Sequence, residues 1–244
     1  MRAPAITVVK LGGSHARSRH LARWLDTLAA CGGRAVIVAG GGPFADAVRA
    51  TQPIMRFDDR AAHHMALLAM EQYALALASL QPRFTLATSI AAIRRALRAH
   101  RVPIWSPVAM VLRARDIAAS WDITSDSLAA WLAGRIAARA LLLVKHIETE
   151  AGPVSAAELV ARGVVDPAFP RFLATSGVAA AIVGPDGCAT AGEAIRATTP
   201  FPSGLDLQPI DVQVDLQVDM QVQDARQPGL VPWPRSKRHA GVGH

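Results

Sequence analysis

VVKLGGS (residues 8–14) and VIVAGGGPFAD (residues 36–46) are two glycine-rich segments near the start of the chain. Each follows an apolar run that predicts a buried strand, and each precedes a pattern typical of a helix. A strand that ends in glycines lets backbone N–H groups approach an anion, because no Cβ blocks the way and the following helix presents its positive end. Two such turns side by side predict a binding site for a phosphorylated ligand.

Lys10 lies at the expected carboxyl end of the first strand, where open α/β sheets bind their ligands. Lysine occurs only at positions 10, 145 and 237, whereas arginine is common throughout the chain. A lysine kept among arginines indicates a need for a compact ammonium group, and a solvated strand end is the alternative. Together with Gly12, Gly13 and Ser14, Lys10 predicts a site for phosphoryl transfer.

Gly40, Gly41 and Gly42 form the second glycine cluster, and Pro43 follows at the expected first turn of a helix. Proline is tolerated there because its missing N–H would have no partner in any case. We interpret the cluster as a pocket for an anionic acceptor. Glycines in tight strand-to-helix turns also serve purely steric needs, and that alternative stays open for the cluster by itself.

The composition bounds the classes of function. The 244-residue chain has a formal net charge of +7, which comes almost entirely from arginine. Basic charge alone is typical of a solvated surface, so we expect no nucleic-acid partner. Cys31 and Cys188 lie far apart in the sequence, which fits reduced thiols and a cytoplasmic location. No apolar stretch reaches the roughly 20 residues of a membrane span, so we expect a soluble protein without a membrane partner.

Apolar, β-branched runs alternate with helical patterns along most of the chain. Strands are predicted at residues 6–9, 36–38, 84–87, 102–105, 141–144 and 179–183. Helices are predicted at residues 19–30, after Pro43, and at residues 58–80, 90–99 and 125–138. This alternation predicts a mainly parallel sheet that is covered by helices on both faces.

The amino-acid pattern of the sequence changes after residue 200. The segment DVQVDLQVDMQV (residues 211–222) repeats DxQV with an apolar residue at every second position, a period that matches a strand. We predict a folded domain over residues 1–203 and a poorly ordered, low-complexity tail over residues 204–244. The alternative is an edge strand that pairs with the core sheet or with another subunit.

WDITSDSLAAWLAG (residues 121–134) gathers four polar side chains at the predicted start of a helix, namely Asp122, Thr124, Ser125 and Asp126. The simplest interpretation is a helix N-cap together with an aspartate that the helix dipole stabilises. Four polar residues exceed what one cap requires. A carboxylate here can hold catalytic lysines in place by charge-assisted hydrogen bonds.

The chain resembles the amino acid kinase superfamily over roughly residues 6–183. The resemblance is carried by VVKLGGS (residues 8–14), VIVAGGGPFADAVR (residues 36–49) and DITSDSLAAWLA (residues 122–133). The resemblance implies a three-layer α/β/α fold around a mostly parallel sheet of about eight strands. It implies that Lys10 stabilises the transferring phosphoryl group, that Asp126 organises the lysines, and that Lys145 matches a lysine that some relatives use near the phosphates. ATP would be the donor, with magnesium held mainly by its phosphates and no metal bound by side chains.

The resemblance also assigns the remaining site residues either to the nucleotide donor or to the phosphate acceptor. The nucleotide phosphates would contact Gly12, Gly13 and Ser14. The acceptor, a small molecule that carries a phosphate, would contact Gly40, Gly41, Gly42, His64, Asp122, Thr124 and Ser125.

Two further segments resemble the branch of the superfamily that phosphorylates [5-(aminomethyl)furan-3-yl]methyl phosphate in methanofuran biosynthesis. They are DDRAAHHMALLAMEQYALALA (residues 58–78) and DPAFPRFLA (residues 166–174). The likeness implies that His64 lies beside the acceptor. A partly buried helix histidine with a local partner is the alternative interpretation of His64.

The turn after the strand at residues 141–144 departs from the family pattern. Many relatives carry an aspartate-rich VDG turn that helps to seat the nucleotide, whereas this chain has His146, Ile147 and Glu148. The chain also lacks a clear further lysine in its C-terminal half, so either Arg171 replaces one or Lys145 suffices.

Three readings of the function therefore stay open. The first is a kinase for a furan-methyl phosphate, and the second is a uridylate or amino-acid kinase. The third is a non-catalytic, oxyanion-binding or storage protein of the same fold, because a shared fold does not fix function. In each case the resemblance implies a homo-oligomer.

Overall fold

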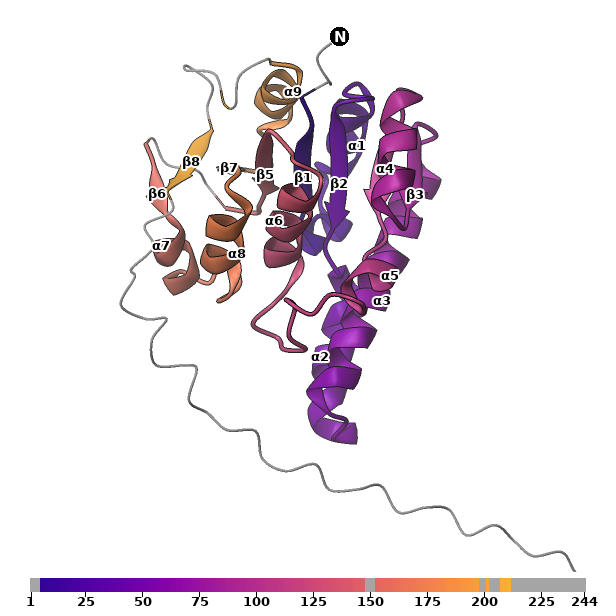
Figure 1. Cartoon of the computed structure of the whole chain (residues 1–244), viewed down its shortest axis with the longest axis vertical. Helices are drawn as coiled ribbons and strands as arrows, with labels where there is room; N and C mark the ends of the chain where they lie inside the picture. Colours follow the sequence, from indigo (N-terminus) through magenta and orange to yellow (C-terminus); the bar gives the residue numbers. More distant parts are fainter. Residues whose placement is uncertain (1–4, 148–151, 198–200, 202–206, 212–244) are drawn as a thin grey trace, which may run out of the picture. The chain divides into compact units, whose positions relative to one another are not determined.

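The computed structural model describes residues 5–147, 152–197, 201 and 207–211. Eight strands in this part of the chain form a single sheet, and helices cover both of its faces (Figure 1). The strands are β1 (Thr7–Leu11), β2 (Ala35–Ala39), β3 (Phe84–Ala87), β4 (Val102–Trp105), β5 (Ala140–Val144), β6 (Val154–Ser155), β7 (Ala179–Val183) and β8 (Gln208–Asp211).

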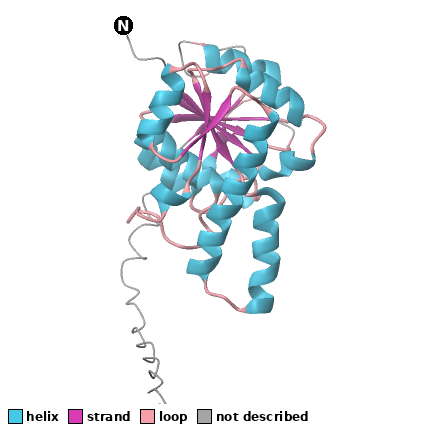
Figure 2. Ribbon diagram, turned by 90° about the vertical axis from the view of Figure 1, so that its right-hand side faces the viewer, coloured by secondary structure: helices cyan, strands magenta, loops and turns pink. Residues whose placement is uncertain are grey.

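The helices connect these strands and form two layers around the sheet (Figure 2). They are the 3₁₀ turn η1 (Gly13–Arg17), α1 (Leu21–Ala29), α2 (Gly42–Met55), α3 (Asp59–Leu80), α4 (Ile90–Arg98), α5 (Val108–Val111), α6 (Ser125–Arg135), α7 (Ala156–Ala161), α8 (Phe169–Ser176) and α9 (Cys188–Arg196). In Figure 1, α2 and the start of α3 extend beyond the sheet. No helix among the described residues has the length and apolar character needed to cross a membrane.

The strand order is β3-β4-β2-β1-β5-β7-β8-β6, and every neighbouring pair is parallel except β7 with β8. β1 lies between β2, which follows it in sequence, and β5, which comes much later. The chain continues from β1 to strands on one side of it, and later strands are added on the other side. The point where the strand order reverses in this way is the switch point of the sheet. Open α/β sheets bind ligands outside the carboxyl ends of the strands at such a point.

Two hydrophobic cores lie on opposite faces of the sheet, one under α6 and the other under α1. Successive residues of a strand point to opposite faces, so Val8 packs in the core under α6, while Val9 and Leu11 pack in the core under α1. The same alternation directs Lys10 toward α6. The pleat of β1 therefore turns its one lysine toward the helix that carries Asp126.

The predicted α/β class and the mostly parallel eight-stranded sheet are confirmed. The strands predicted at residues 84–87, 102–105 and 179–183 have the bounds of β3, β4 and β7. β8, which follows the predicted domain boundary at residue 203, pairs with both β7 and β6 inside the sheet. The DxQV repeat lies outside the described residues from position 212 onward, as does the rest of the predicted tail.

Candidate active site

The two glycine turns pack against each other backbone to backbone. A Cβ atom on Gly13 would lie 2.2 Å from the backbone nitrogen of Gly42, and one on Gly40 would lie 2.5 Å from the nitrogen of Gly13. Gly42 also has φ +54°, a left-handed conformation that glycine adopts without strain. The close approach brings η1 next to the N-terminus of α2, whose first N–H groups have no partner within the helix. The steric and the anion-binding interpretations of the glycines are therefore compatible.

Lys10, Asp126 and Lys145 form one buried ionic cluster. Nζ of Lys10 lies 2.9 Å from Oδ1 of Asp126, and Nζ of Lys145 lies 2.7 Å from Oδ2. The lysines converge because β1 and β5 are neighbours in the sheet, with Lys10 opposite Leu143 and Lys145 two residues further on. The Lys145 ammonium also donates a hydrogen bond to the carbonyl oxygen of Val164. One carboxylate thus connects both cations.

Burial and charge act against each other on the pKa values of this cluster. Burial acts to raise the pKa of the Asp126 carboxyl, but the positive charges of Lys10 and Lys145 outweigh it and lower the pKa. Burial and the charge of Lys10 lower the pKa of Lys145 from 10.5 to about 8, against the attraction of Asp126. Asp126 is therefore ionised at neutral pH, and Lys145 loses its proton more easily than an ordinary lysine.

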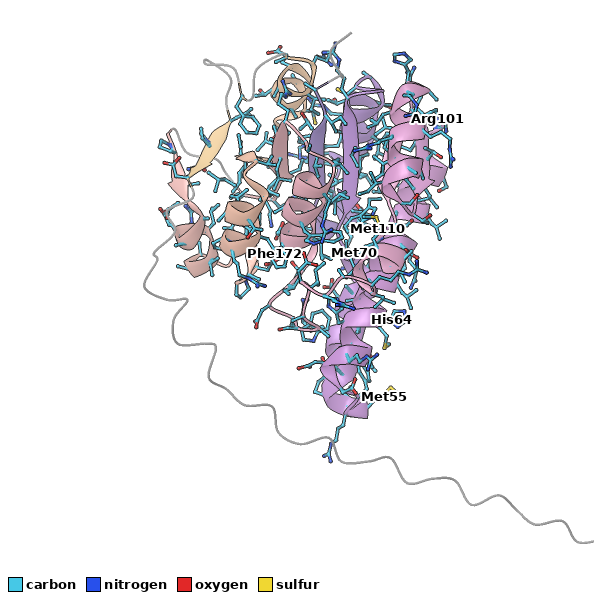
Figure 3. The ribbon with its side chains drawn as sticks, viewed as in Figure 1. Met55, His64, Met70, Arg101, Met110 and Phe172 are labelled. Atoms are coloured by element: carbon cyan, nitrogen blue, oxygen red, sulfur yellow. The ribbon has the colours of Figure 1, made fainter. Side chains whose placement is uncertain are left out.

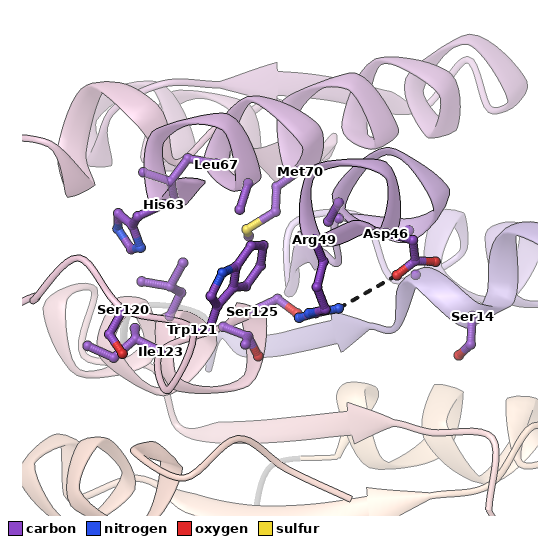
Figure 4. Close-up of a pocket in the computed structure, with 17 residues that line it drawn as sticks. Ser14, Asp46, Arg49, His63, Leu67, Met70, Ser120, Trp121, Ile123 and Ser125 are labelled. Atoms are coloured by element: carbon purple, nitrogen blue, oxygen red, sulfur yellow. Dashed lines mark ion pairs between the residues drawn. The ribbon is translucent and has the colours of Figure 1, made fainter. Parts of the chain in front are cut away.

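A cavity of about 290 Å³ lies beside the two glycine turns and the start of α6 (Figure 4). Its walls come from the two glycine turns, from α2 and α3, and from the segment that leads into α6. They comprise Gly13, Ser14, Gly41, Gly42, Ala45, Asp46, Arg49, His63, Ala66, Leu67, Met70, Ser120, Trp121, Ile123, Thr124, Ser125 and Leu128. Gly13 adjoins Gly12, whose added Cβ would lie 3.6 Å from Nζ of Lys10, and Ser125 adjoins Asp126. The cavity wall and the cluster are therefore neighbours in sequence at two places, although the three cluster side chains do not line the cavity.

Most of the residues predicted for the site meet at this place. Gly13, Ser14, Gly41, Gly42, Thr124 and Ser125 line the cavity, whereas Gly12 and Gly40 are buried behind its wall. Asp122 does not line the cavity, contrary to the prediction. Asp122 precedes the first residue of α6 by three positions, and its side chain is exposed. Its carboxylate accepts a hydrogen bond of 3.1 Å from Oγ of Ser120.

Of two neighbouring histidines on α3, His63 lines the cavity, whereas His64 was predicted from the sequence to lie beside the acceptor. His63 is buried, whereas His64 is exposed on the part of α3 that extends beyond the sheet (Figure 3). The buried face of α3 continues through Leu67 and Met70, which lie four and seven residues after His63 and therefore on the same side of the helix. Burial lowers the pKa of His63, so a neutral imidazole faces the cavity at neutral pH.

Arg49 and Trp121 line the cavity and were not predicted. The guanidinium carbon of Arg49 lies 4.4 Å from the centroid of the Trp121 ring, and Nη1 lies 3.7 Å from Oδ1 of Asp46. The indole N–H of Trp121 donates a hydrogen bond of 2.6 Å to Gln52. In Figure 4 the arginine from α2 and the tryptophan before α6 lie next to each other in the wall. The arginine lies seven residues after Gly42, so helical periodicity offered a signal for it.

Asp166 is a buried residue near the site that also received no predicted role. Its carboxylate accepts hydrogen bonds from the backbone and hydroxyl groups of both Thr124 and Ser127, in the first turn of α6. The donors lie about forty residues earlier in the chain, so no local pattern identifies this contact.

The turn after β5 contains His146, whose ring packs against the ring of His15 from η1. The rings of His15 and His146 lie 4.3 Å apart, measured between centroids. Burial, followed by the charges of His146 and Lys10, lowers the pKa of His15 to about 4. Glu148 lies outside the described residues. The ring contact thus joins η1, after β1, to the turn after β5.

Arg171 lies away from the ionic cluster. It stacks over Phe172 at 4.8 Å and lines a different cavity with Trp131 and Arg135. The described residues contain no group of three or more His, Cys, Asp or Glu side chains arranged to bind a metal ion. Of the two cations considered as a partner for Lys10, Lys145 and not Arg171 lies in the ionic cluster.

The chain was compared with known proteins. A model of the amino acid kinase family matches residues 5–149, which is more than half of the chain. No curated protein sequence matches it. The fold is similar to that of a uridylate kinase from Archaeoglobus fulgidus, with 16% identity, 84% of this chain and 100% of that chain covered, and a TM-score of 0.63. A UMP kinase from Ureaplasma parvum shares 13% identity, with 85% and 99% covered and a TM-score of 0.61. An aspartate kinase from Synechocystis shares 13% identity, with 74% and 38% covered and a TM-score of 0.53. The family match and the shared fold together show that the chain belongs to the amino acid kinase family.

Proposed function

We propose that the protein is an ATP-dependent small-molecule kinase that transfers the γ-phosphoryl group to a phosphate oxygen of its acceptor. The observation that carries the proposal is the buried Lys10–Asp126–Lys145 cluster, next in sequence to Ser125 in the wall of a cavity. The N-terminus of α2 and the Arg49 guanidinium make that cavity favourable for an anion. Membership of the amino acid kinase family supports the same class of reaction.

The proposed chemistry is an in-line displacement. An oxygen of the acceptor phosphate forms a bond to the γ-phosphorus, and the bond from that phosphorus to the bridging oxygen breaks, so ADP leaves with that oxygen and the electron pair. The attacking oxygen is already anionic at neutral pH, so the step requires no general base. Lys10 and Lys145 would offset the charge on the transferring group. Asp126 would hold both ammonium groups in position without taking a proton, which agrees with its lowered pKa.

The walls of the cavity favour a compact acceptor with one anionic end. Backbone N–H groups of the glycine turns and the guanidinium of Arg49 border one part, while Leu67, Met70 and Ile123 supply an apolar part. A phosphate monoester on a small ring matches both parts. We therefore propose a furan-methyl phosphate of methanofuran-type cofactor biosynthesis as the acceptor. UMP and an amino-acid derivative are the alternatives, since solved structures of this fold include uridylate and aspartate kinases.

ATP would direct its phosphates to the turn of Gly12, Gly13 and Ser14, between Lys10 and Lys145. Asp126 is engaged by both ammonium groups, and the described residues offer no carboxylate cluster, so the donor set does not favour a resident metal site. Magnesium would therefore arrive on the phosphates of ATP and neutralise part of their charge.

A coupled ADP-release assay tests the proposal with three acceptors, namely the furan-methyl phosphate, UMP and acetylglutamate. We expect turnover with the furan-methyl phosphate and a loss of at least about a hundredfold in kcat for Lys10→Ala, because an electrostatic contact to the transferring group is removed. Nucleotide binding by Lys10→Ala, measured by calorimetry, should persist and controls for folding. Full turnover by Lys10→Ala would overturn the role of this lysine.

The storage alternative makes a different prediction. A non-catalytic protein would bind an oxyanion tightly and release no ADP with any of the three acceptors. It would also have no need for two ammonium groups on one aspartate. The assay thus separates the two classes of function.

A further inference from the structure

We infer that Asp166 is a positioning residue of the transfer site, which fixes the first turn of α6 and so the carboxylate that connects Lys10 to Lys145. The kinetic part of this inference rests on the proposed function. Its structural part concerns only the position of Asp126 and Lys145 and can be tested without turnover.

The contacts of Asp166 are concentrated on the residues that flank Asp126. Oδ2 accepts hydrogen bonds from the backbone N–H of Thr124 at 3.0 Å, from its hydroxyl at 2.8 Å and from the N–H of Ser127 at 3.0 Å. The hydroxyl of Ser127 donates to Oδ1. Asp166 itself is 7% exposed. Four donors on one buried carboxylate fix the backbone on both sides of Asp126.

The start of α6 differs from the starts of the other capped helices. Asp58, Ser89 and Ser155 each cap their own helix by accepting a hydrogen bond from a backbone N–H three residues later. The N-cap residue of α6 is Thr124, whose side chain makes no such bond, because its hydroxyl donates to Asp166 instead. A carboxylate from a distant segment therefore supplies the negative charge that the N-terminus of α6 favours.

The same segment also holds one of the two cations. The carbonyl oxygen of Val164, two residues before Asp166, accepts a hydrogen bond from the Lys145 ammonium. Residues 164–166 thus contact Lys145 through a carbonyl oxygen and, through Asp166, the first turn of α6, which carries the Asp126 partner of the 2.7 Å ion pair. Movement of this segment would separate the two charges.

Two substitutions separate position from charge. Asp166→Asn keeps an oxygen at the position of Oδ2, which accepts three of the four hydrogen bonds. At the position of Oδ1 the amide NH₂ can donate to the hydroxyl of Ser127, because a hydroxyl can accept as well as donate. Asp166→Ala removes all four acceptor contacts. Ser89→Ala is the matched control, because it removes a helix cap from α4, which contributes no residue to the cavity or the ionic cluster.

Lysine labelling with an amine-reactive acylating reagent, followed by mass spectrometry of peptides, tests the structural part. The labelling rate of Lys145 is measured in the full chain without ligand at a pH of about 10.5, where an ordinary lysine is half deprotonated and access to the amine dominates the rate. We expect Asp166→Ala to raise this rate at least about fivefold, while Asp166→Asn and Ser89→Ala stay within about twofold of the unsubstituted chain. An unchanged rate in Asp166→Ala, or an equal rise in Ser89→Ala, would overturn the inference.

Steady-state kinetics test the catalytic consequence. Asp166→Ala should lower kcat at least about tenfold with a smaller change in the KM for ATP, and Asp166→Asn should recover most of the loss. If Asp166→Ala does not fold, Thr124→Val, which removes one donor, still tests the inference by a raised labelling rate of Lys145, with Asp166→Asn as the variant expected to stay unchanged. An unsubstituted chain that never releases ADP contradicts the proposed function, whereas the labelling result still decides the role of Asp166.

Discussion

Gly13 and Gly42 approach each other so closely that a side chain at position 13 has no space between the two turns. A methyl group there would lie 2.2 Å from the backbone nitrogen of Gly42. Because the obstacle is backbone rather than the end of a flexible side chain, Gly13→Ala must displace one of the two turns. We expect it to lower the free energy of unfolding by about 3 kcal/mol, measured by denaturant titration, and to abolish phosphoryl transfer.

Gly12→Ala is the matched control for that substitution. Gly12 has φ −61° and ψ 144°, which alanine adopts freely, and the nearest atoms to an added Cβ lie 3.4 Å away. We expect a change in the free energy of unfolding of less than about 1 kcal/mol. Equal stability of the two variants would contradict the importance of the backbone contact.

Asp126→Ala should leave two buried ammonium groups without their counter-ion. We expect a loss of about 3–5 kcal/mol in the free energy of unfolding at neutral pH. The folded-state pKa of Asp126 lies below its ordinary 3.8, so the ion-pair contribution is present above about pH 4 and is lost as the pH falls below that value. The difference in Tm between Asp126→Ala and the unsubstituted chain should therefore shrink in acid. A constant difference down to pH about 2 would contradict this electrostatic origin.

Lys145 should set the alkaline limit of activity. Its pKa of about 8 means that the free enzyme loses this positive charge as the pH rises through that value, so kcat/KM should fall there. Lys145→Arg keeps a charge throughout this range and should flatten the alkaline limb even where it lowers the maximal rate. The measurement is the pH dependence of kcat/KM from about pH 6 to pH 10. An unchanged alkaline limb in Lys145→Arg would assign the titration to another group.

His63 should contribute to acceptor binding, and His64 should not. His63→Ala removes a neutral imidazole from the cavity wall, and loss of one hydrogen bond predicts about a tenfold rise in the KM of the acceptor with little change for ATP. His64→Ala changes an exposed side chain and should leave both KM values as they are. The prediction fails if the two variants behave alike.

The exposed face of α3 should form an interface between copies of the chain. Met65, Leu68 and Leu75 are exposed on one side of this helix, to 39%, 41% and 56%. Adjacent apolar side chains of this kind favour an interface over solvent. We expect Leu68→Lys with Leu75→Lys to yield a smaller species by size-exclusion chromatography with light scattering.

The control for this interface is Met55→Lys, which also changes an exposed apolar side chain but lies at the end of α2 rather than on α3 (Figure 3). It should leave the oligomeric state unchanged. A monomeric unsubstituted chain would contradict the interface altogether.

Local signals predicted most of the sheet and part of the site. Buried parallel strands read as continuous apolar runs, so β3, β4 and β7 were predicted with their observed bounds. β8 was missed because its four residues, QPID, include a proline and carry no such run. Its place in the sheet depends on pairing with β7 and β6, which the local sequence does not encode.

The site shows the same division between local and long-range information. Lys10 and the glycines follow from strand-to-turn patterns, and Asp126 follows from the polar start of a helix. The choice of His63 over His64 required the buried face of α3, which is ambiguous where alanine fills both sides of the helix. Asp166 required a tertiary contact, and nothing in DPAFPRFLA marks its first residue as the cap of another helix.

The position of β8 has a consequence for synthesis of the chain. β6 lies at the edge of the sheet, and its neighbour there is β8, some fifty residues later in sequence. The strands that carry Lys10 and precede Lys145 are complete far earlier in the chain. During vectorial synthesis the strands around the ionic cluster can therefore assemble while β7 still presents an open edge. A ribosome-bound chain must protect that edge until Gln208–Asp211 emerges.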